Sequence, residues 1–264
     1  MRAIAGLLIS LCLCCGGTPA AADLSGGYKP ATSTATNPIF NQGVWTFDLR
    51  PNKCNPRPYV GNESETPCAG GRRTTQIRAK RDIRVGQTVR YSFEVFIPKD
   101  FVYDGDPRFP AYSRLLIAEW KRSKGNKNHL YEMLLDSKRG ATYERQICFR
   151  PREFGKWNRF ELVIKWSRKS DGFMEARCNG RVVLSRQRTQ TVIPPDCGAE
   201  YKLQCAPEKQ IPTAPIMWLL GPNLSGYGRD FASLSHHPKT PFPPFPPNGV
   251  KLMMRNLSVE QFRR

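Results

Sequence analysis

Three histidines and one tyrosine between glycines are the first candidates for chemistry, because imidazole and phenol groups can exchange protons with a reacting molecule. His129 is the histidine that lies beside a predicted strand, whereas His236 and His237 lie in a proline-rich stretch. Tyr227 stands between two glycines, where we expect a turn. His129 is therefore a candidate catalytic base or acid, and its alternative role is a surface or capping histidine. Tyr227 is a second catalytic candidate, and its alternative role is to stack on a bound sugar.

The elements that must position these residues are strands. Apolar and polar residues alternate with a period of two over residues 88–97 and 158–166. An Asn-Gly pair at 179–180 separates two strand-like runs, 173–178 and 181–185, and predicts a tight hairpin. We expect further strands at 114–121, 131–136, 142–149, 216–220 and 251–261. Many short strands separated by Gly and Pro, without a long amphipathic helix, predict an all-β, two-sheet sandwich or jelly roll.

The N-terminus has the pattern of an export signal. Arg2 precedes an apolar run from Ile4 to Leu13, and Ala20 and Ala22 give the small-x-small pattern of a cleavage site. A run of roughly 10 residues is too short for a membrane span, which needs about 20. We therefore expect residues 1–22 to be a signal peptide, and the protein to be secreted or periplasmic without a membrane span.

The rest of the chain has the length of one domain. Residues 23–70 are rich in Pro, Gly, Asn and Thr, and we expect a loop-rich segment that wraps the outside. Residues 71–264 would then form the β domain itself. Within it, residues 236–249 contain several prolines and are expected to run as an extended surface loop. We expect a monomer.

The cysteines agree with export. Three of the nine lie in residues 1–22, and the others are Cys54, Cys68, Cys148, Cys178, Cys197 and Cys205. An even number in an oxidising compartment suggests disulfides, although six cysteines allow about 15 pairings. We favour Cys54–Cys68 and Cys197–Cys205 as local loops, with Cys148–Cys178 joining two strands. The alternative is a metal site, but zinc-ligand spacings such as CxxC or CxxH are missing among these six cysteines. We expect neither a metal nor another cofactor.

The net charge of +19 points to the class of partner. Such a positive field favours polyanions, which include acidic polysaccharide, nucleic acid and anionic membrane surfaces. A basic surface that only keeps the protein soluble is the alternative. Nucleic acid ranks last, because the basic residues are spread along strands without a recognised binding module.

Three stretches, residues 86–101, 113–122 and 155–183, resemble the polysaccharide lyases of the heparin lyase and glucuronan lyase type. The resemblance covers about residues 72–262, and 155–183 is its most specific part. It implies a concanavalin-like jelly roll whose concave sheet forms a groove for a sugar chain. It also implies β-elimination on a polymer that contains uronic acid. In that reaction a cation or amide neutralises the uronate carboxylate, a base removes the neighbouring proton, and an acid protonates the leaving oxygen.

Site residues follow from the resemblance position by position. The family's Gln-x-His strand reads Glu119-Trp120-Lys121 here, so Lys121 becomes a candidate base or carboxylate clamp, and we expect Glu119 to orient it. The family's early Arg-x-Glu-x-Arg strand looks like residues 74–78. The family's Lys-x-Gly-x-Tyr is replaced by 219–223, with Tyr227 as the nearest tyrosine. The expected substrate-binding residues are Arg73, Gln76, Arg78, Glu119, Tyr143, Arg145 and Asn223.

Two other functions compete with a lyase that acts on acidic polysaccharide. The altered motifs suggest a non-catalytic binding protein on the same scaffold. A glycoside hydrolase would need two carboxylates across the scissile bond, about 5–9 Å apart. Glu132 and Asp136 are candidates for such a pair, because alternation puts them on one face. We rank the hydrolase behind the other two.

Overall fold

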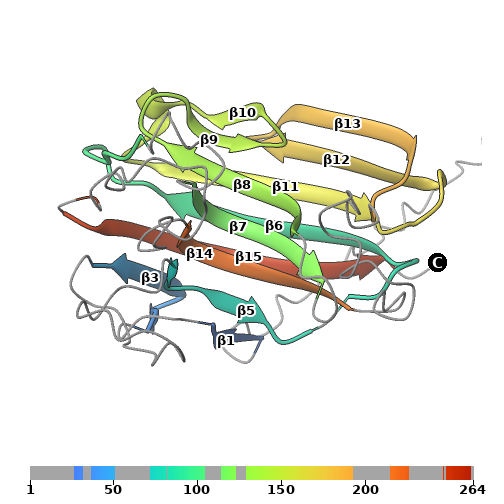
Figure 1. The fold of residues 1–264 in the computed structure, drawn as a ribbon, viewed down its shortest axis with the longest axis horizontal. Coiled ribbons are helices and arrows are strands. Elements are labelled where there is room, and N and C mark those ends of the chain that lie inside the picture. The colour runs from blue at the N-terminus through green and yellow to red at the C-terminus, as the bar shows by residue number, and fades with distance from the viewer. Residues whose placement is uncertain are drawn as a thin grey trace, which may run out of the picture.

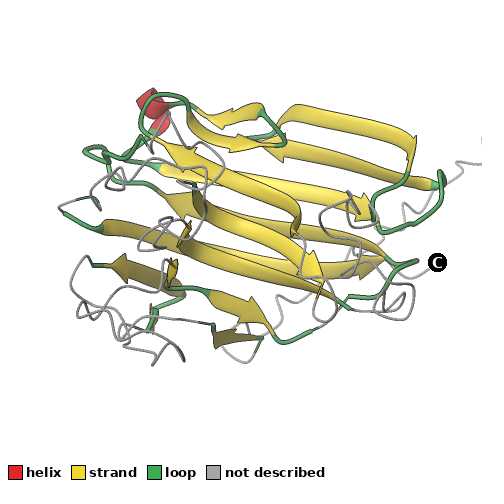
Figure 2. Cartoon of the chain, viewed as in Figure 1, coloured by secondary structure: helices red, strands yellow, loops and turns green. Residues whose placement is uncertain are grey.

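The computed structural model describes residues 27–31, 37–50, 72–81, 83–104, 114–122, 129–192, 215–225, 246 and 248–262. Within these residues the chain forms two antiparallel β-sheets that lie one over the other, with their strands along the long axis of the molecule (Figure 1). Strands dominate Figure 2, and the helical element drawn there is one short 3-10 turn, Pro151–Glu153. The expected signal peptide, Cys54, Cys68, Cys197, Cys205 and Tyr227 lie outside the described residues.

The first sheet has eight strands and carries the candidate site. Its main order is β1-β5-β14-β7-β8-β9-β10, and β4 pairs with β14 beside β5. The strands are β1 (Tyr28–Pro30), β4 (Arg72–Thr74), β5 (Ile77–Ala79), β7 (Leu115–Arg122), β8 (His129–Asp136), β9 (Gly140–Tyr143), β10 (Gln146–Phe149) and β14 (Ile216–Ser225). Strands distant in sequence are thus neighbours in the centre of the sheet.

The second sheet has seven strands in the order β13-β12-β11-β6-β15-β3-β2. They are β2 (Ile39–Asn41), β3 (Val44–Leu49), β6 (Thr88–Phe96), β11 (Trp157–Lys165), β12 (Gly172–Cys178), β13 (Arg181–Thr189) and β15 (Val250–Phe262). β15, from the end of the chain, lies between β6 and β3. The all-β, two-sheet jelly roll predicted from the sequence is confirmed.

The core lies between the two sheets. The predicted alternation in β6 is confirmed, because every second residue from Val89 to Ile97 is buried. Tyr91 of β6 contacts Trp120 of β7 and Trp218 of β14, with ring centroids 5.7 and 5.1 Å apart. Apolar burial of this kind is the main source of folding free energy. Each sheet therefore has one face fixed by the core, and its alternate residues project from the other face.

Two turn predictions had different outcomes. The Asn179-Gly180 hairpin is confirmed: both residues have positive φ, 49° and 81°, and they join β12 to β13. The single strand expected at 142–149 was wrong. Glu144 and Arg145, with φ of 48° and 67°, break it into β9 and β10, which pair with each other. Neither residue is a glycine, so no residue type at these two positions indicates the turn.

Part of the segment 23–70, which we expected to be loop-rich and to wrap the outside, is instead a strand of the core. Residues 44–49 form β3, which pairs with β15 inside the seven-stranded sheet. Its alternate side chains, Trp45, Phe47 and Leu49, are buried in the core. Their period-two spacing is the same signal that identified the later strands, but it occupies only six residues within a loop-like composition.

A disulfide links Cys148 in β10 to Cys178 in β12, as the sequence analysis favoured. It connects an edge strand of the eight-stranded sheet to the seven-stranded sheet. The described part of the chain contains no helix that could span a membrane.

Candidate functional site

The candidate site lies on the face of the eight-stranded sheet that is turned away from the core. In β7, Trp120 points into the core, so Glu119 and Lys121 project from the opposite face. Glu119 is nevertheless fully buried, with 0% of its surface exposed. A buried carboxylate needs hydrogen-bond donors around it, because its desolvation is costly.

Glu119 has those donors on both of its oxygens. Its Oε1 accepts a hydrogen bond from Gln76 Nε2 at 2.8 Å and another from Asn223 Nδ2 at 2.7 Å. Its Oε2 lies 3.2 Å from Lys121 Nζ, in an ion pair whose lysine side chain is 12% exposed. Gln76 and Asn223 are themselves buried, at 2% and 0% exposure. We call Gln76, Glu119, Lys121 and Asn223 the Glu119 cluster.

The backbone brings the two amides to the carboxylate. Gln76 lies between β4 and β5, and its Nε2 also donates to the carbonyl oxygen of Gly221 at 3.2 Å. β14 has a register shift between Leu220 and Asn223, which places Asn223 opposite Thr74 and Leu116. The shift therefore adjusts the position of Asn223 relative to β7.

Gly221 is needed at this irregularity. It has φ of 106°, and an added Cβ would lie 2.5 Å from the Phe47 ring and 2.6 Å from the carbonyl oxygen of Thr75. A side chain there would clash with both a core ring and the backbone beside Gln76. Sequence reasoning did not identify Gly221 as part of the site, although its place in a Gly-Pro pair was a signal for irregular backbone.

Further charges lie along the same face. Arg78 of β5 is two residues from Gln76, with the buried Ile77 between them, so alternation places Gln76 and Arg78 on one face. Arg78 and Glu119 are both register partners of Leu219 in β14. Positive side chains of Arg78 and Lys121 therefore belong to strands on either side of β14.

The carboxylates expected for a hydrolase have other partners. Glu132 of β8 is the register partner of Glu119, and it forms an ion pair with Arg114 just before β7. Asp136 ends β8, accepts hydrogen bonds from the backbone N–H groups of Lys138 and Arg139, and forms an ion pair with Arg139. Asp136 thus stabilises the turn to β9, whereas Glu132 is paired with Arg114.

Two expected substrate-binding residues lie elsewhere. The prediction for Tyr143 was wrong: it is fully buried between the sheets, with its ring 5.8 Å from that of Trp120 and 5.2 Å from that of Phe160. Burial raises the pKa of its phenol well above the ordinary value. Tyr143 lies on the core side because alternation along β9 places it on the same face as the buried Ala141. Arg145 is exposed on the turn between β9 and β10, away from the strands that carry the Glu119 cluster.

For two other expected residues, His129 and Arg73, the structure describes the backbone only, and for a third, Tyr227, it describes neither backbone nor side chain. The backbone of His129 is the register partner of Lys121, at the start of β8. The backbone of Arg73 pairs with that of Leu224 in β14. Tyr227 follows the end of β14 by two positions and lies outside the described residues. These three stay predictions.

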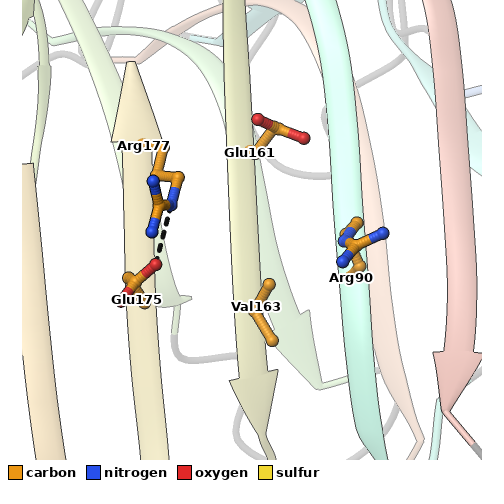
Figure 3. A pocket seen from close by; sticks show the side chains of 5 residues that line it. All are labelled: Arg90, Glu161, Val163, Glu175 and Arg177. Carbon is orange, nitrogen blue, oxygen red and sulfur yellow. Dashed lines mark hydrogen bonds and ion pairs between the residues drawn. The ribbon is translucent and has the colours of Figure 1, made fainter. Parts of the chain in front are cut away.

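A pocket of about 360 Å³ lies on the other sheet, on its outer face (Figure 3). Arg90 of β6, Glu161 and Val163 of β11, and Glu175 and Arg177 of β12 line it. Arg177 Nε lies 2.8 Å from Glu175 Oε1, so this pair is made within one strand. The charges here are mixed and partly exposed, in contrast to the buried Glu119 cluster.

The described residues contain no group of three or more His, Cys, Asp or Glu side chains that could hold a metal ion. The Glu119 cluster is one carboxylate surrounded by nitrogen donors, which suits hydrogen bonding and charge stabilisation.

No protein-family model and no curated protein matches the chain. Several solved structures do resemble it. A glucuronan lyase from the fungus Trichoderma reesei is 12% identical, with a TM-score of 0.49 over 88% of this chain and 87% of that one. An alginate lyase from Alteromonas is 9% identical, with a TM-score of 0.45 over 91% and 96%. An alginate lyase from Chlorella virus is 12% identical, with a TM-score of 0.45 over 89% and 91%. These neighbours are polysaccharide lyases, and at such identities the likeness concerns the fold.

Proposed function

We propose that this protein is a secreted polysaccharide lyase that cleaves a polymer containing uronic acid by β-elimination. The observation that carries the proposal is the Glu119 cluster with Arg78 beside it: positive and polar side chains from β5, β7 and β14 gather on the face turned away from the core. The net charge of +19 suits a polyanionic substrate.

The reaction needs positive charge next to the substrate carboxylate. Removal of the proton on the carbon beside that carboxylate places negative charge on its oxygens, and nearby cations stabilise this charge. Arg78 and Lys121 are the residues proposed to do so. The carbon–hydrogen bond breaks, a carbon–carbon double bond forms, and the bond to the neighbouring sugar oxygen breaks.

Two further residues are proposed to move protons. His129, whose backbone pairs with Lys121, would act as the base that takes the proton. Tyr227 would donate a proton to the leaving sugar oxygen. Arg73, whose backbone pairs with Leu224 of β14, would contribute to binding of the sugar chain, and Asn223 would support the Glu119 carboxylate.

The test is turnover of defined polymers. The chain from residue 23 onward is incubated with glucuronan, alginate, heparin and pectate, and the ultraviolet absorbance of the unsaturated product is followed. We expect product from at least one polymer, and we expect Lys121→Met to lower kcat/KM by about 100-fold or more. Lys165→Met is the matched control, because Lys165 lies on the seven-stranded sheet in an ion pair with Asp171.

The competing function is a binding protein for acidic polysaccharide. It would give salt-sensitive binding to the same polymers without any unsaturated product. That result would rule out the lyase and leave the binding role.

A further inference from the structure

We infer that Glu119 is a positioning residue that keeps Lys121 protonated, so that Lys121 serves as a fixed positive charge for the substrate carboxylate and not as the base. The role of Lys121 in catalysis rests on the proposed function. Its protonation state does not, and it can be measured separately.

The first step concerns the charge of Glu119. Its carboxylate accepts hydrogen bonds from Gln76 at 2.8 Å, from Asn223 at 2.7 Å and from Lys121 at 3.2 Å. Donors of this kind stabilise the ionised carboxylate, even where burial alone would favour the neutral acid. The fully buried Glu119 is therefore held as an anion.

The second step concerns Lys121. Its Nζ lies 3.2 Å from a carboxylate oxygen, and only 12% of its side chain is exposed. Partial burial favours the neutral amine, whereas an opposite charge at this distance favours the ammonium ion. Since the Glu119 anion is stabilised by two amides as well, loss of the lysine proton would remove a positive charge that lies 3.2 Å from a buried carboxylate oxygen, which is strongly unfavourable.

The neighbouring elements support this reading. On β14, the register partner of Lys121 is the apolar Met217. On β8, Lys121 faces the backbone of His129, and Glu132 is engaged with Arg114. Arg78, on β5, lies beyond β14. Among these groups, the Glu119 carboxylate is in direct contact with Lys121.

The same geometry changes the expected role of Gln76. Both hydrogens of its amide nitrogen have acceptors, one on Glu119 and one on the carbonyl oxygen of Gly221. The amide cannot donate to a substrate carboxylate without breaking one of these bonds. Gln76 therefore belongs to the support of Glu119, and neutralisation of the substrate passes to Lys121 and Arg78.

The direct test is the titration of Lys121 by NMR, in protein labelled with ¹³C at the lysine ε carbon, with Lys121→Arg used to assign its signal. We expect the midpoint to lie above the ordinary lysine value of about 10.4. In Glu119→Gln we expect it to fall by about one pH unit or more. A wild-type midpoint below the ordinary value would overturn the inference, and this result needs no variant of Glu119 to fold. An unchanged midpoint in folded Glu119→Gln would overturn it as well.

The pH profile of kcat/KM gives a second test, because the two possible roles of Lys121 predict opposite changes of activity as pH rises. If Lys121 must be protonated, activity is lost as pH rises through its pKa, and Glu119→Gln moves that loss to lower pH. If Lys121 were the base, activity would instead appear as pH rises, and the same variant would move the onset to lower pH, which contradicts the inference. Glu175→Gln, beside Arg177 on the other sheet, should leave the pH at which activity appears and the pH at which it is lost unchanged. Absence of product at every pH would refute the proposed function and leave the titration result standing.

Discussion

The outer faces of the two sheets use similar residues in different ways. On the eight-stranded sheet, Glu119 is bound by side chains 43 and 104 positions away in the sequence, and it is fully buried. On the seven-stranded sheet, Glu175 pairs with Arg177 two residues along the same strand, and the two side chains are 33% and 46% exposed. One face converges on a single buried carboxylate, whereas the other carries separate, partly exposed ion pairs, both within a strand and between β6 and β15.

The difference shows what strand alternation can and cannot tell. Alternate polar residues lie on one face in both sheets, because side chains on a strand project to opposite sides in turn. Only strand order decides whether the polar residues of separate strands meet. In the eight-stranded sheet β14 lies between β5 and β7, and it is this order that brings Gln76, Asn223 and Glu119 together.

The largest expected effect comes from removal of the central carboxylate. Glu119→Ala leaves the buried amides and the ammonium group without their common acceptor, so the free energy of unfolding should fall by about 3–5 kcal/mol. Urea unfolding followed by circular dichroism measures this change. Glu175→Ala is the matched control, and an exposed pair of this kind contributes about 0–1 kcal/mol. Equal losses in the two variants would show that the faces do not differ as described.

The next effect tests how the two sheets are joined. The Cys148–Cys178 disulfide closes a loop of 30 residues. Loss of such a cross-link raises the entropy of the unfolded chain, and the expected cost is about 3 kcal/mol. Thermal and urea unfolding of Cys148→Ser/Cys178→Ser, which leaves no unpaired thiol at this position, measures it. A stability equal to that of the parent protein would mean that packing alone holds this edge.

The two faces also differ in how far the sequence could predict them. Period-two alternation identified β6, β11 and most other strands, because the core requires one apolar face. The resemblance placed Gln76, Glu119, Lys121 and Asn223 among the site residues, and the structure brings these four together. The sequence alone did not predict that the amides would bond to Glu119, since this depends on the irregular backbone at Gly221.

The wrong predictions also have physical reasons, because long-range strand pairing decides the position of these residues. Tyr143 was assigned to the site, but tyrosine suits both a core and a sugar-binding face, and only the register of β9 decides between them. β3 was missed because the composition around it is typical of a loop, although its three alternate apolar residues are buried. Short strands in polar surroundings give a weak local signal, and long-range pairing determines their place.

The smallest effect concerns a single surface group on the seven-stranded sheet. Asp171 accepts a hydrogen bond from Lys165 at 2.7 Å and another from Ser167, and these bonds lower its pKa from 3.8 to about 2. Because the pKa is depressed on folding, the contribution to stability is present above the unfolded value of about 3.9 and is lost as pH falls through the folded value.

NMR titration of the Asp171 carboxyl carbon measures this shift directly. In Lys165→Met the midpoint should rise towards the ordinary value, since the first and largest cause of the shift is removed. The free energy of unfolding at neutral pH should hardly change, because an exposed pair is screened by water. A large loss of stability in Lys165→Met would mean that surface pairs on this sheet support the fold as strongly as the buried Glu119 cluster, and the contrast between the two faces would then be lost.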